Sequence, residues 1–275
     1  MKSTFSISAD KYKAFLPIIS ALEKAGSQQN IPFILIGAFA RDLLLNEVYK
    51  YDLNFRATLD IDFAVIVNDW DEYKELLESI LTFPGFQKTK IPHRLNYSSI
   101  DIDIIPFGAI AKYNQIKWPE NDSLVLNVLG FKEVYAKSIS CQINKIEFNI
   151  VSLEGFIVIK LLAWNDRKLI THKDAEDLGI FLFNYNNLNP EELFSDFSYL
   201  IESSNYDYTM TGVKILAIKL RDFINQSTEL KKTVISILKN ELSDPDNSQL
   251  ATYLSKIVEY EYSYQIIETL YKALV

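Results

Sequence analysis

The chain has 275 residues, enough for one large domain or two modest ones, and its 48% hydrophobic and 23% charged residues are ordinary for a globular protein. A net charge of −8 argues against a protein that coats long nucleic acids, and the single cysteine excludes an internal disulfide and a cysteine-based zinc site. No apolar run approaches the roughly 20 residues of a membrane span and the N-terminus carries no signal-peptide pattern, so we expect a cytoplasmic protein without membrane contact.

The first elements are a helix, a strand and a second helix. Apolar residues at helical spacing predict a helix over about residues 10–26, with Gly26 as its C-cap. Residues 31–36 predict a short buried strand, which runs directly into a helix over residues 37–45 that begins at Gly37. The free N–H groups of such a strand–glycine–helix junction suit an anion, although a plain tight turn explains the glycine equally well.

Two strand patterns carry acidic side chains on one face. In the first, residues 61–67, Asp60 and Asp62 lie opposite the apolar face, and in the second Asp101 and Asp103 do the same. If the strands are neighbours the carboxylates converge, and two charges about 4 Å apart repel by roughly 4 kcal/mol at an effective dielectric constant near 20. Such a cluster must be hydrated, protonated or bound to a cation. Carboxylate and phosphate oxygens together suit Mg²⁺, which indicates phosphoryl or nucleotidyl transfer.

The remaining patterns divide the chain into two parts. Asp69 or Asp71 can cap a helix that ends near Leu81, residues 88–97 predict one strand that leads into the second acidic strand, and residues 48–58 predict a loop. Short strands are expected near 124–129, 138–143 and 145–150, and helices near 153–166, 172–184, 190–202, 208–225, 228–241 and 248–273, the last one broken. We therefore expect an α/β domain over residues 1–150 and a helical domain over residues 151–275.

Two basic residues of the helical part, Lys160 and Arg167, lie seven positions apart and so share a helix face. They form either a basic wall for a triphosphate or an ordinary solvated face, and the acidic strands elsewhere in the chain favour the first interpretation for Lys160. Ahead of the second acidic strand, His93 and Arg94 are interpreted as a surface pair on a hairpin, with a substrate contact as the alternative. Cys141 is expected to be buried.

The next helix begins with a dense polar segment. Thr171 can cap this helix, Asp174 occupies the capping-box position, and Asp177 shares the face of Asp174. Lys173, Asp174 and Asp177 therefore fit a scaffold role, a nucleotide contact, or both.

Taken together these motifs resemble the DNA polymerase β-like nucleotidyltransferase superfamily, and within it the AbiEii/AbiGii toxin-type nucleotidyltransferases. The resemblance runs from about Phe33 to Phe183 and is carried by Gly37 with Arg41 and Asp42, by Arg56–Asp62, by Asp103–Gly108, and by Lys160–Arg167 followed by Lys173–Leu178. One residue departs from the pattern. Ala38 follows Gly37 where the superfamily usually has serine or glycine, so triphosphate binding would depend more on backbone N–H groups.

The resemblance implies an α+β fold, in which a polymerase β-like core with a small mixed sheet flanked by helices precedes a helical domain. It implies transfer of a nucleoside monophosphate from a nucleoside triphosphate to an acceptor hydroxyl. Asp60, Asp62 and Asp103 would be the catalytic and metal-binding residues, with two Mg²⁺ ions, or Mn²⁺ in their place. The implied nucleotide-binding residues are Gly37, Ala38, Arg41, Arg56, Thr58, Lys160, Lys173, Asp174 and Asp177.

The acceptor is less constrained than the reaction. Similarity to toxins implies an RNA acceptor such as a tRNA 3′ end, or a protein hydroxyl, together with a cognate antitoxin. One alternative is an enzyme that adenylates a small antibiotic, which the negative net charge suits because aminoglycosides are cations. Another is a non-catalytic module that binds a nucleotide or a partner protein, which Ala38 favours and the complete set of carboxylates opposes.

Overall fold

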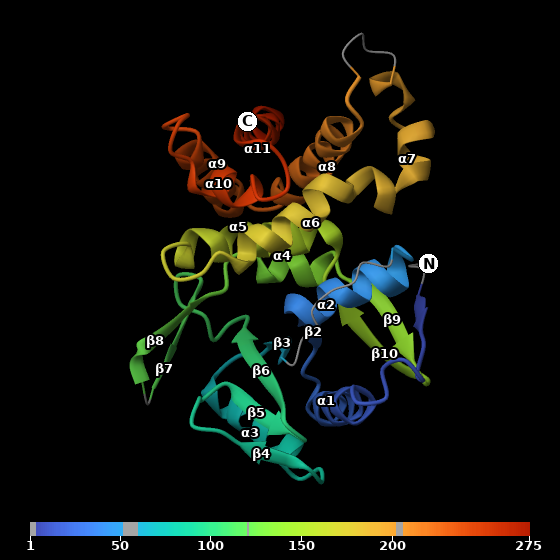
Figure 1. The fold of residues 1–275 in the computed structure, drawn as a ribbon. Coiled ribbons are helices and arrows are strands. Elements are labelled where there is room, and N and C mark those ends of the chain that lie inside the picture. The colour runs from blue at the N-terminus through green and yellow to red at the C-terminus, as the bar shows by residue number, and fades with distance from the viewer. Residues whose placement is uncertain (1–3, 52–59, 120, 202–205) are drawn as a thin grey trace. The chain divides into compact units, whose positions relative to one another are not determined.

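The computed structural model describes residues 4–51, 60–119, 121–201 and 206–275, so the predicted site residues Arg56 and Thr58 and most of the predicted loop lie outside the described residues. The chain divides into two compact units, Met1–Ser152 and Leu153–Val275 (Figure 1). The first is a mixed sheet with helices and the second is helical, so the α+β prediction is confirmed.

The first unit is built on an eight-stranded sheet within the described residues. Its strands are β1 (Phe5–Ile7), β2 (Phe33–Ile36), β3 (Asp60–Ile66), β4 (Phe86–Lys88), β5 (Arg94–Tyr97), β6 (Ile100–Phe107), β9 (Ile139–Ile143) and β10 (Ile146–Ile150). They lie in the order β1-β9-β10-β2-β3-β6-β5-β4. Strand β3 pairs parallel with β6 and antiparallel with β2, while β5 pairs antiparallel with β6, so the two acidic strands are central neighbours.

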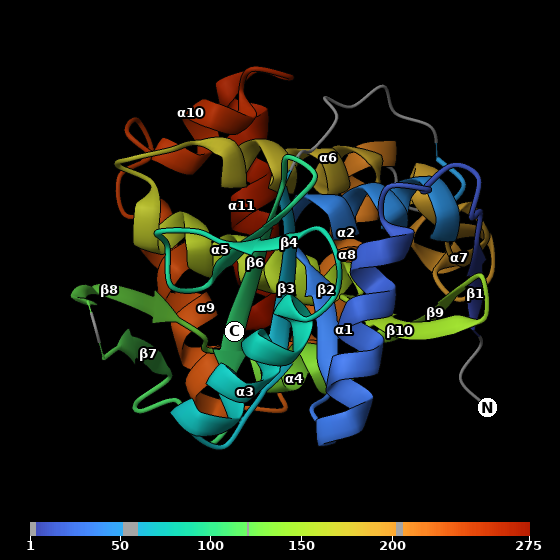
Figure 2. The same ribbon diagram turned by 90° about the horizontal axis from the view of Figure 1, so that it is seen from below.

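Helices cover this sheet, and a hairpin adjoins it. They are α1 (Leu16–Gln29), α2 (Gly37–Leu43), which continues as a π-helical turn over Leu44–Val48, α3 (Trp70–Leu81) and α4 (Phe131–Ala136), and the hairpin consists of β7 (Gln115–Trp118) and β8 (Asn121–Asn127). Helices α1 and α3 pack against each other beside the sheet (Figures 1 and 2). Asp69 caps α3 by accepting hydrogen bonds from two backbone N–H groups, as predicted.

The apolar faces of the acidic strands form the core of the first unit. Phe63 of β3 is fully buried and its ring contacts those of Phe15 and Phe33. On β6, the carbonyl of Ile104 accepts a hydrogen bond from the buried Tyr73 hydroxyl of α3 at 2.8 Å. These contacts fix which face of each strand points away from the core, and therefore the face on which the carboxylates lie.

The second unit contains the helices α5 (Leu153–Arg167), α6 (Lys173–Leu188), α7 (Pro190–Phe194), α8 (Tyr208–Ile224), α9 (Thr228–Glu241), α10 (Gln249–Leu254) and α11 (Tyr260–Leu274). Helix α8 packs against both α6 and α11. The predicted helix over 190–202 is too long, because α7 ends at Phe194 and only a 3₁₀ turn, Ser198–Leu200, follows. Among the described residues, none of the helices has the length and apolar character needed to cross a membrane.

The predicted end of the first helix is wrong. Helix α1 continues past Gly26 to Gln29, and Asn30 takes the left-handed conformation at its C-cap with φ 55°. Gly26 serves a different purpose, since a Cβ there would lie 2.7 Å from the carbonyl oxygen of Ile31. The chain turns back close over the helix at this point, and glycine allows that approach.

The predicted single strand over residues 88–97 is also wrong. It consists of the ends of two antiparallel strands, β4 and β5, joined by a turn over 89–93. Thr89 stabilises this turn, because its hydroxyl accepts a hydrogen bond from the Ile91 N–H at 3.1 Å and donates one to the Arg94 carbonyl at 2.9 Å. The strand β7 and the helix α4 were not predicted.

Candidate active site

The four acidic side chains of β3 and β6 lie in register. Asp60 is the partner of Asp101 and Asp62 is the partner of Asp103. Adjacent strands lie about 4.8 Å apart, and the alternation places all four side chains on one face of the sheet. The expectation that the two acidic strands are neighbours is therefore confirmed.

Gly37 lies directly against this cluster. Strand β2 ends at Ile36, which is the partner of Asp62 across the antiparallel ladder. The next residue, Gly37, has φ +73°, and a Cβ placed on it would lie 2.0 Å from Asp62 Oδ2. Both the backbone conformation and the space thus require glycine, and they bring the start of α2 next to a carboxylate.

Arg94 of β5 binds the two carboxylates of β6. Its Nε and Nη2 donate to the two oxygens of Asp103 at 2.6 and 2.8 Å, and its Nη1 donates to Asp101 Oδ2 at 3.0 Å. Asn96, two residues along β5, donates to Asp101 Oδ1 at 2.9 Å. The hydrogen bonds to Asp103 raise the pKa of Arg94 above its ordinary value, so the guanidinium is a permanent charge in the cluster.

The interpretation of His93 and Arg94 as a surface pair is therefore wrong. Side-chain exposure is 12% for His93 and 25% for Arg94. Burial lowers the pKa of His93. The negative charge of Asp103 raises this pKa, and the positive charge of Arg94 lowers it further. The net shift is downward, so the ring is neutral at pH 7. His93 Nε2 lies 4.0 Å from Asp103 Oδ1 and the ring lies 5.2 Å from that of Trp118. A signal was present in the sequence, since Arg94 and Asn96 alternate with apolar residues.

The carboxylates fit a divalent cation by their chemistry and register. Within residues 4–51, 60–119, 121–201 and 206–275, no group of three His, Cys, Asp or Glu side chains is already gathered around a common metal position. Asp60 is exposed and Asp62 is partly exposed, so both can offer oxygens to an ion. A carboxylate has about four lone-pair sites, so the two bonds from Arg94 leave Asp103 able to accept further ligands.

In the α2 segment, Arg41 has its side chain 10% exposed and donates from Nε and Nη2 to Asp42 Oδ1 at 2.8 and 2.6 Å. Ala38 occupies the first turn of α2 beside Gly37. The structure thus groups Gly37, Ala38 and the carboxylates at one end of the central strands β2, β3 and β6, while the nucleotide contacts expected of Arg41 stay a prediction.

A second ionic cluster lies within the second unit. Lys160 of α5 pairs with Asp174 Oδ1 at 3.1 Å and with Asp177 Oδ2 at 2.6 Å. Arg167 donates from Nε and Nη2 to the oxygens of Asp174 at 2.6 and 2.8 Å. Lys160 and Arg167 thus share a helix face, as predicted, and Lys173 at the start of α6 is exposed.

Asp174 is fully buried, and it is not a capping residue. The N-cap of α6 is His172, without a side-chain cap, and Thr171 Oγ1 accepts only a 3.3 Å hydrogen bond from the Lys173 N–H. The capping-box interpretation is wrong because the carboxylate turns to the cations of α5. Burial raises the pKa of Asp174, but its bonds to Arg167 and Lys160 outweigh burial and hold it below its usual range.

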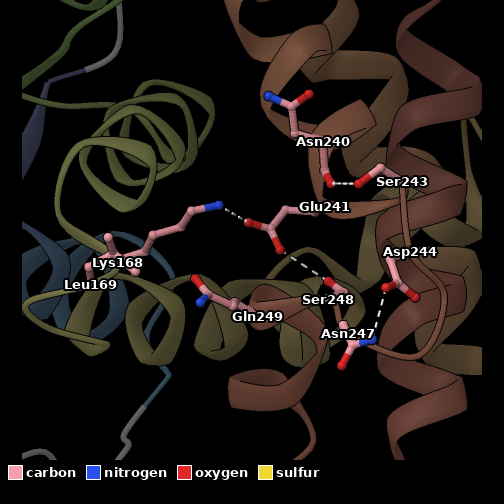
Figure 3. A pocket seen from close by; sticks show the side chains of 9 residues that line it. All are labelled: Lys168, Leu169, Asn240, Glu241, Ser243, Asp244, Asn247, Ser248 and Gln249. Atoms are coloured by element: carbon pink, nitrogen blue, oxygen red, sulfur yellow. Dashed lines mark hydrogen bonds and ion pairs between the residues drawn. The ribbon is translucent and has the colours of Figure 1, made fainter.

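Sequence reasoning missed another buried carboxylate in the second unit, Glu241 at the end of α9. It borders a polar pocket of about 260 Å³, where its side chain lies between Lys168 and Ser248 (Figure 3). It accepts hydrogen bonds from Trp164 Nε1 at 3.0 Å, Lys168 Nζ at 2.8 Å, Ser248 Oγ at 3.1 Å and the Leu250 N–H at 2.9 Å. Four donors occupy the lone-pair sites of the carboxylate. We therefore interpret Glu241 as a structural residue that holds together the segments that donate to it.

Residues 21–249 match the family model described as "Nucleotidyl transferase AbiEii toxin, Type IV TA system". The chain belongs to this family. It is therefore a nucleotidyltransferase, and the predicted family membership is confirmed. The matched segment includes both acidic strands, Gly37 and the ionic cluster around Lys160.

Two solved structures are similar to the chain at low identity. The crystal structure of ANT(2″)-Ia in complex with adenylyl-2″-tobramycin is 16% identical, with 66% of this chain and 93% of that chain covered and a TM-score of 0.40. The CCA-adding enzyme of Thermotoga maritima in complex with tRNA is 16% identical, with 95% of this chain and 79% of that chain covered and a TM-score of 0.26. No curated protein matches the chain significantly.

Proposed function

We propose that this protein transfers a nucleoside monophosphate from a nucleoside triphosphate to a hydroxyl group of RNA, such as a tRNA 3′ end, and that the reaction needs a divalent cation. The observation that carries the proposal is the register of Asp62 with Asp103 on neighbouring parallel strands, with Gly37 directly against Asp62. Family membership supports the reaction class, and the choice of RNA is ours.

The carboxylates and the turn at Gly37 would bind different parts of the donor nucleotide and its metal ions. Asp60 and Asp62, with Asp103, would hold two Mg²⁺ ions, or Mn²⁺ in their place, which when bound neutralise phosphate charge and lower the pKa of an acceptor hydroxyl. The backbone N–H groups of Gly37 and Ala38 would bind the phosphates of the donor. Because alanine has no hydroxyl, backbone N–H groups carry this contact, assisted by the predicted contacts Arg41, Arg56 and Thr58.

Asp103 is our candidate for the general base, or for the group that orients the acceptor. Arg94 holds both of its oxygens, which fixes the rotamer of the carboxylate and still leaves a lone pair on each oxygen. One of these can accept the proton of the acceptor hydroxyl as the new bond to phosphorus forms and pyrophosphate leaves. His93, neutral beside Asp103, adds no second positive charge there.

In the second unit we propose that Asp174 and Asp177 position Lys160, whose ammonium group would supply charge to the triphosphate. Asp174 is fully buried, so its own role is exerted through Lys160 and Arg167. Lys173 is exposed and keeps its predicted role as a nucleotide contact. A cognate antitoxin is part of the same proposal, because the family description places these proteins in a toxin–antitoxin system.

The proposal is tested with purified protein, each of the four α-labelled nucleoside triphosphates, Mg²⁺ and total tRNA. We expect label on RNA, and none when the cation is removed by a chelator. Asp62→Asn should abolish labelling but leave the melting temperature unchanged or slightly higher, because it removes one charge from a repelling cluster.

Parallel reactions contain an aminoglycoside or a cell lysate in place of tRNA. Label confined to the aminoglycoside or to a lysate protein would move the acceptor to that class. Absence of label in every reaction would favour a non-catalytic binding module. Asp62→Asn activity within about tenfold of wild type would contradict the assignment of Asp62 as a metal ligand.

A further inference from the structure

The carboxylate face of β3 and β6 includes a cationic side chain. Arg94 of β5 is the register partner of Asp103 on β6, which is in turn the partner of Asp62 on β3. Directly paired residues project to the same face of a sheet, so the guanidinium lies among the carboxylates and not over the core. It donates hydrogen bonds of 2.6 and 2.8 Å to the two oxygens of Asp103 and one of 3.0 Å to Asp101. Arg94 is therefore part of the site that would hold the metal ions.

The hydrogen bonds of Arg94 change what the β6 carboxylates can offer to an ion. A carboxylate has about four lone-pair sites, and the two bonds from Arg94 occupy one site on each oxygen of Asp103. A divalent ion must use the remaining sites, and it must bind beside a full positive charge. Both oxygens of Asp101 are engaged as well, Oδ2 by Arg94 and Oδ1 by Asn96. The carboxylates of β6 are thus poorer ion ligands than their register alone suggests.

The guanidinium acts on both acidic strands. Hydrogen bonds to Asp103 raise the pKa of Arg94 above its ordinary value, and burial opposes this shift. The charges of Asp103, Asp101 and Asp60 raise the same pKa further, and Asp60 lies on β3. In the part of the chain that the structure describes, no three His, Cys, Asp or Glu side chains are gathered around a common metal position. The carboxylates must therefore shift to share two ions, and such a shift would weaken the bonds of Arg94.

The charge of the face leads to the same conclusion. The face carries four negative charges, from Asp60, Asp62, Asp101 and Asp103, and Arg94 offsets one of them. One divalent ion would leave the face with one negative charge, whereas a second would make it positive. Two ions would just neutralise the same four carboxylates if Arg94 were removed. A donor triphosphate brings several negative charges and oxygen ligands, so it makes the second ion favourable beside Arg94.

We propose that Arg94 makes binding of the second divalent cation depend on the donor nucleotide. Asp60 and Asp62 bind the first ion, and Asp103 binds the second tightly only when a triphosphate supplies phosphate oxygens and negative charge. Asp103 therefore becomes competent to act on an acceptor hydroxyl after the donor has bound. The proposal rests on the proposed function for its two ions, and adds the order in which they bind and the residue that sets this order.

A residue that only orients a metal ligand has the opposite effect on the ion. Loss of such a hydrogen-bond partner typically weakens metal binding roughly 10- to 100-fold. Arg94 differs from such a partner because it is charged and because it binds both oxygens of Asp103. Removal of Arg94 therefore distinguishes the two roles by the direction in which the ion affinity changes.

The test counts bound ions without catalysis. Equilibrium dialysis of the purified protein against Mn²⁺ measures the ions bound per chain, with and without a nucleoside triphosphate analogue that cannot release pyrophosphate. We expect wild type to bind one ion tightly without the analogue and two with it. Arg94→Gln should bind two ions in both conditions, and without the analogue its second ion should bind at least about tenfold more tightly than that of wild type.

Lys88→Gln is the matched control. It removes one positive charge from the adjacent strand β4, but Lys88 is the partner of the buried Leu95 and so lies on the face opposite Arg94. Its ion binding should equal that of wild type, and equal strengthening by both variants would overturn the proposal. Addition of Asp103→Asn to Arg94→Gln should remove the second ion again, which assigns the gained ion to Asp103.

Thermal unfolding gives a second measurement in case Arg94→Gln is less stable. In chelator this variant should melt below wild type, because the carboxylates lose the charge that offsets their repulsion. Mn²⁺ should then raise its melting temperature by more than it raises that of wild type, because a tightly bound ion stabilises the folded state. An equal rise in both proteins would contradict the proposal.

Failure of this inference and failure of the proposed function give different results. If wild type binds two ions equally well with and without the analogue, or if Arg94→Gln weakens ion binding, the role given to Arg94 is wrong, while labelling of RNA by wild type keeps the proposed function. If ion binding follows the expected pattern but no RNA is labelled, the inference stands and the RNA acceptor fails. If wild type binds no Mn²⁺ even with the analogue, both are overturned.

Discussion

At the scale of residues, the carboxylate cluster contains its own cation. Four aspartates share one face of β3 and β6, and repulsion of roughly 4 kcal/mol per close pair would oppose folding if nothing neutralised them. Arg94 offsets part of that repulsion by binding Asp101 and Asp103 together. The sequence predicted the cluster from alternation, which is local. The alternation of Arg94 and Asn96 was also a local signal, but only the register of β5 with β6 shows that Arg94 meets Asp103.

The arrangement separates the roles of Asp101 and Asp103. Asp103 is the partner of Asp62 and is 13% exposed, whereas Asp101 is 36% exposed and its oxygens are bound by Arg94 and Asn96. Asp103→Ala should therefore lower kcat by a factor of at least ~10³, as expected when a metal ligand and a base are lost together. Asp101→Ala should lower it by less than about tenfold. Single-turnover rates at saturating nucleotide measure both.

The control for this comparison is Asn96→Ala, which removes one hydrogen bond to Asp101 and leaves every carboxylate in place. It should behave like Asp101→Ala or more mildly. If Asp101→Ala is the slower of the two aspartate variants, the assignment of Asp103 as the base is wrong.

At the scale of elements, the sequence predicts well the features that depend only on residues close together in the chain. The alternation of β3 and β6 and the Asp69 cap of α3 agree with the structure. The errors arose where distant contacts decide the outcome. Gly26 is required within α1 because the returning chain at Ile31 passes close over it, and the Asp174 carboxylate does not cap α6 because it binds Lys160 and Arg167.

At the junction of β2 and α2, the local backbone conformation and a contact with the distant Asp62 both require glycine at position 37. Gly37→Ala would strain a backbone with φ +73°, which costs about 1–2 kcal/mol for a residue with a Cβ, and would force that Cβ into Asp62 Oδ2. We expect a lower melting temperature, and weaker binding of nucleoside triphosphate because Asp62 must move. Thermal unfolding and a nucleotide titration measure the two effects.

Ala38→Ser, one residue further along α2, is the matched control. Serine fits the helical backbone there, so the melting temperature should stay close to that of wild type. Equal melting temperatures for wild type and Gly37→Ala would show that the junction relaxes easily, and would remove the steric link between Gly37 and Asp62.

At the scale of the whole molecule, the two units bury their polar groups in different ways. The first unit keeps Asp60 exposed and Asp62 and Asp101 partly exposed on its central strands, and the second buries Asp174 and Glu241 among cations and N–H donors. The Glu241 cluster could not be predicted from sequence, since Trp164 and Glu241 are 77 positions apart. The compact units divide between Ser152 and Leu153, where the sequence changes from strand to helical periodicity.

The buried carboxylates make the second unit sensitive to acid. Burial raises the pKa of Glu241, but hydrogen bonds from Lys168, Leu250 N–H and Trp164 outweigh it and lower the pKa below its ordinary value, as the cations do for Asp174. When the folded-state pKa is the lower one, the unfolded chain takes up protons first. The stabilisation is therefore complete above the ordinary carboxyl pKa of about 4 and is lost as pH falls through the lowered folded-state values.

Trp164 reports on this loss, because its indole donates to Glu241 and it is the tryptophan of the second unit. In a Trp70→Phe/Trp118→Phe background, the urea midpoint seen by Trp164 fluorescence should fall as pH drops below the ordinary carboxyl pKa of about 4. Glu241→Gln should cost about 1–3 kcal/mol at neutral pH, because buried donors lose a charged acceptor, and should flatten the acid dependence. Trp164→Phe removes the indole donor to Glu241 and the fluorescent reporter together, so the unfolding of this variant is followed by circular dichroism. If Glu241→Gln keeps the full acid dependence, protonation of Asp174 or of other carboxylates must account for it, and Asp174→Asn then becomes the variant that flattens the curve.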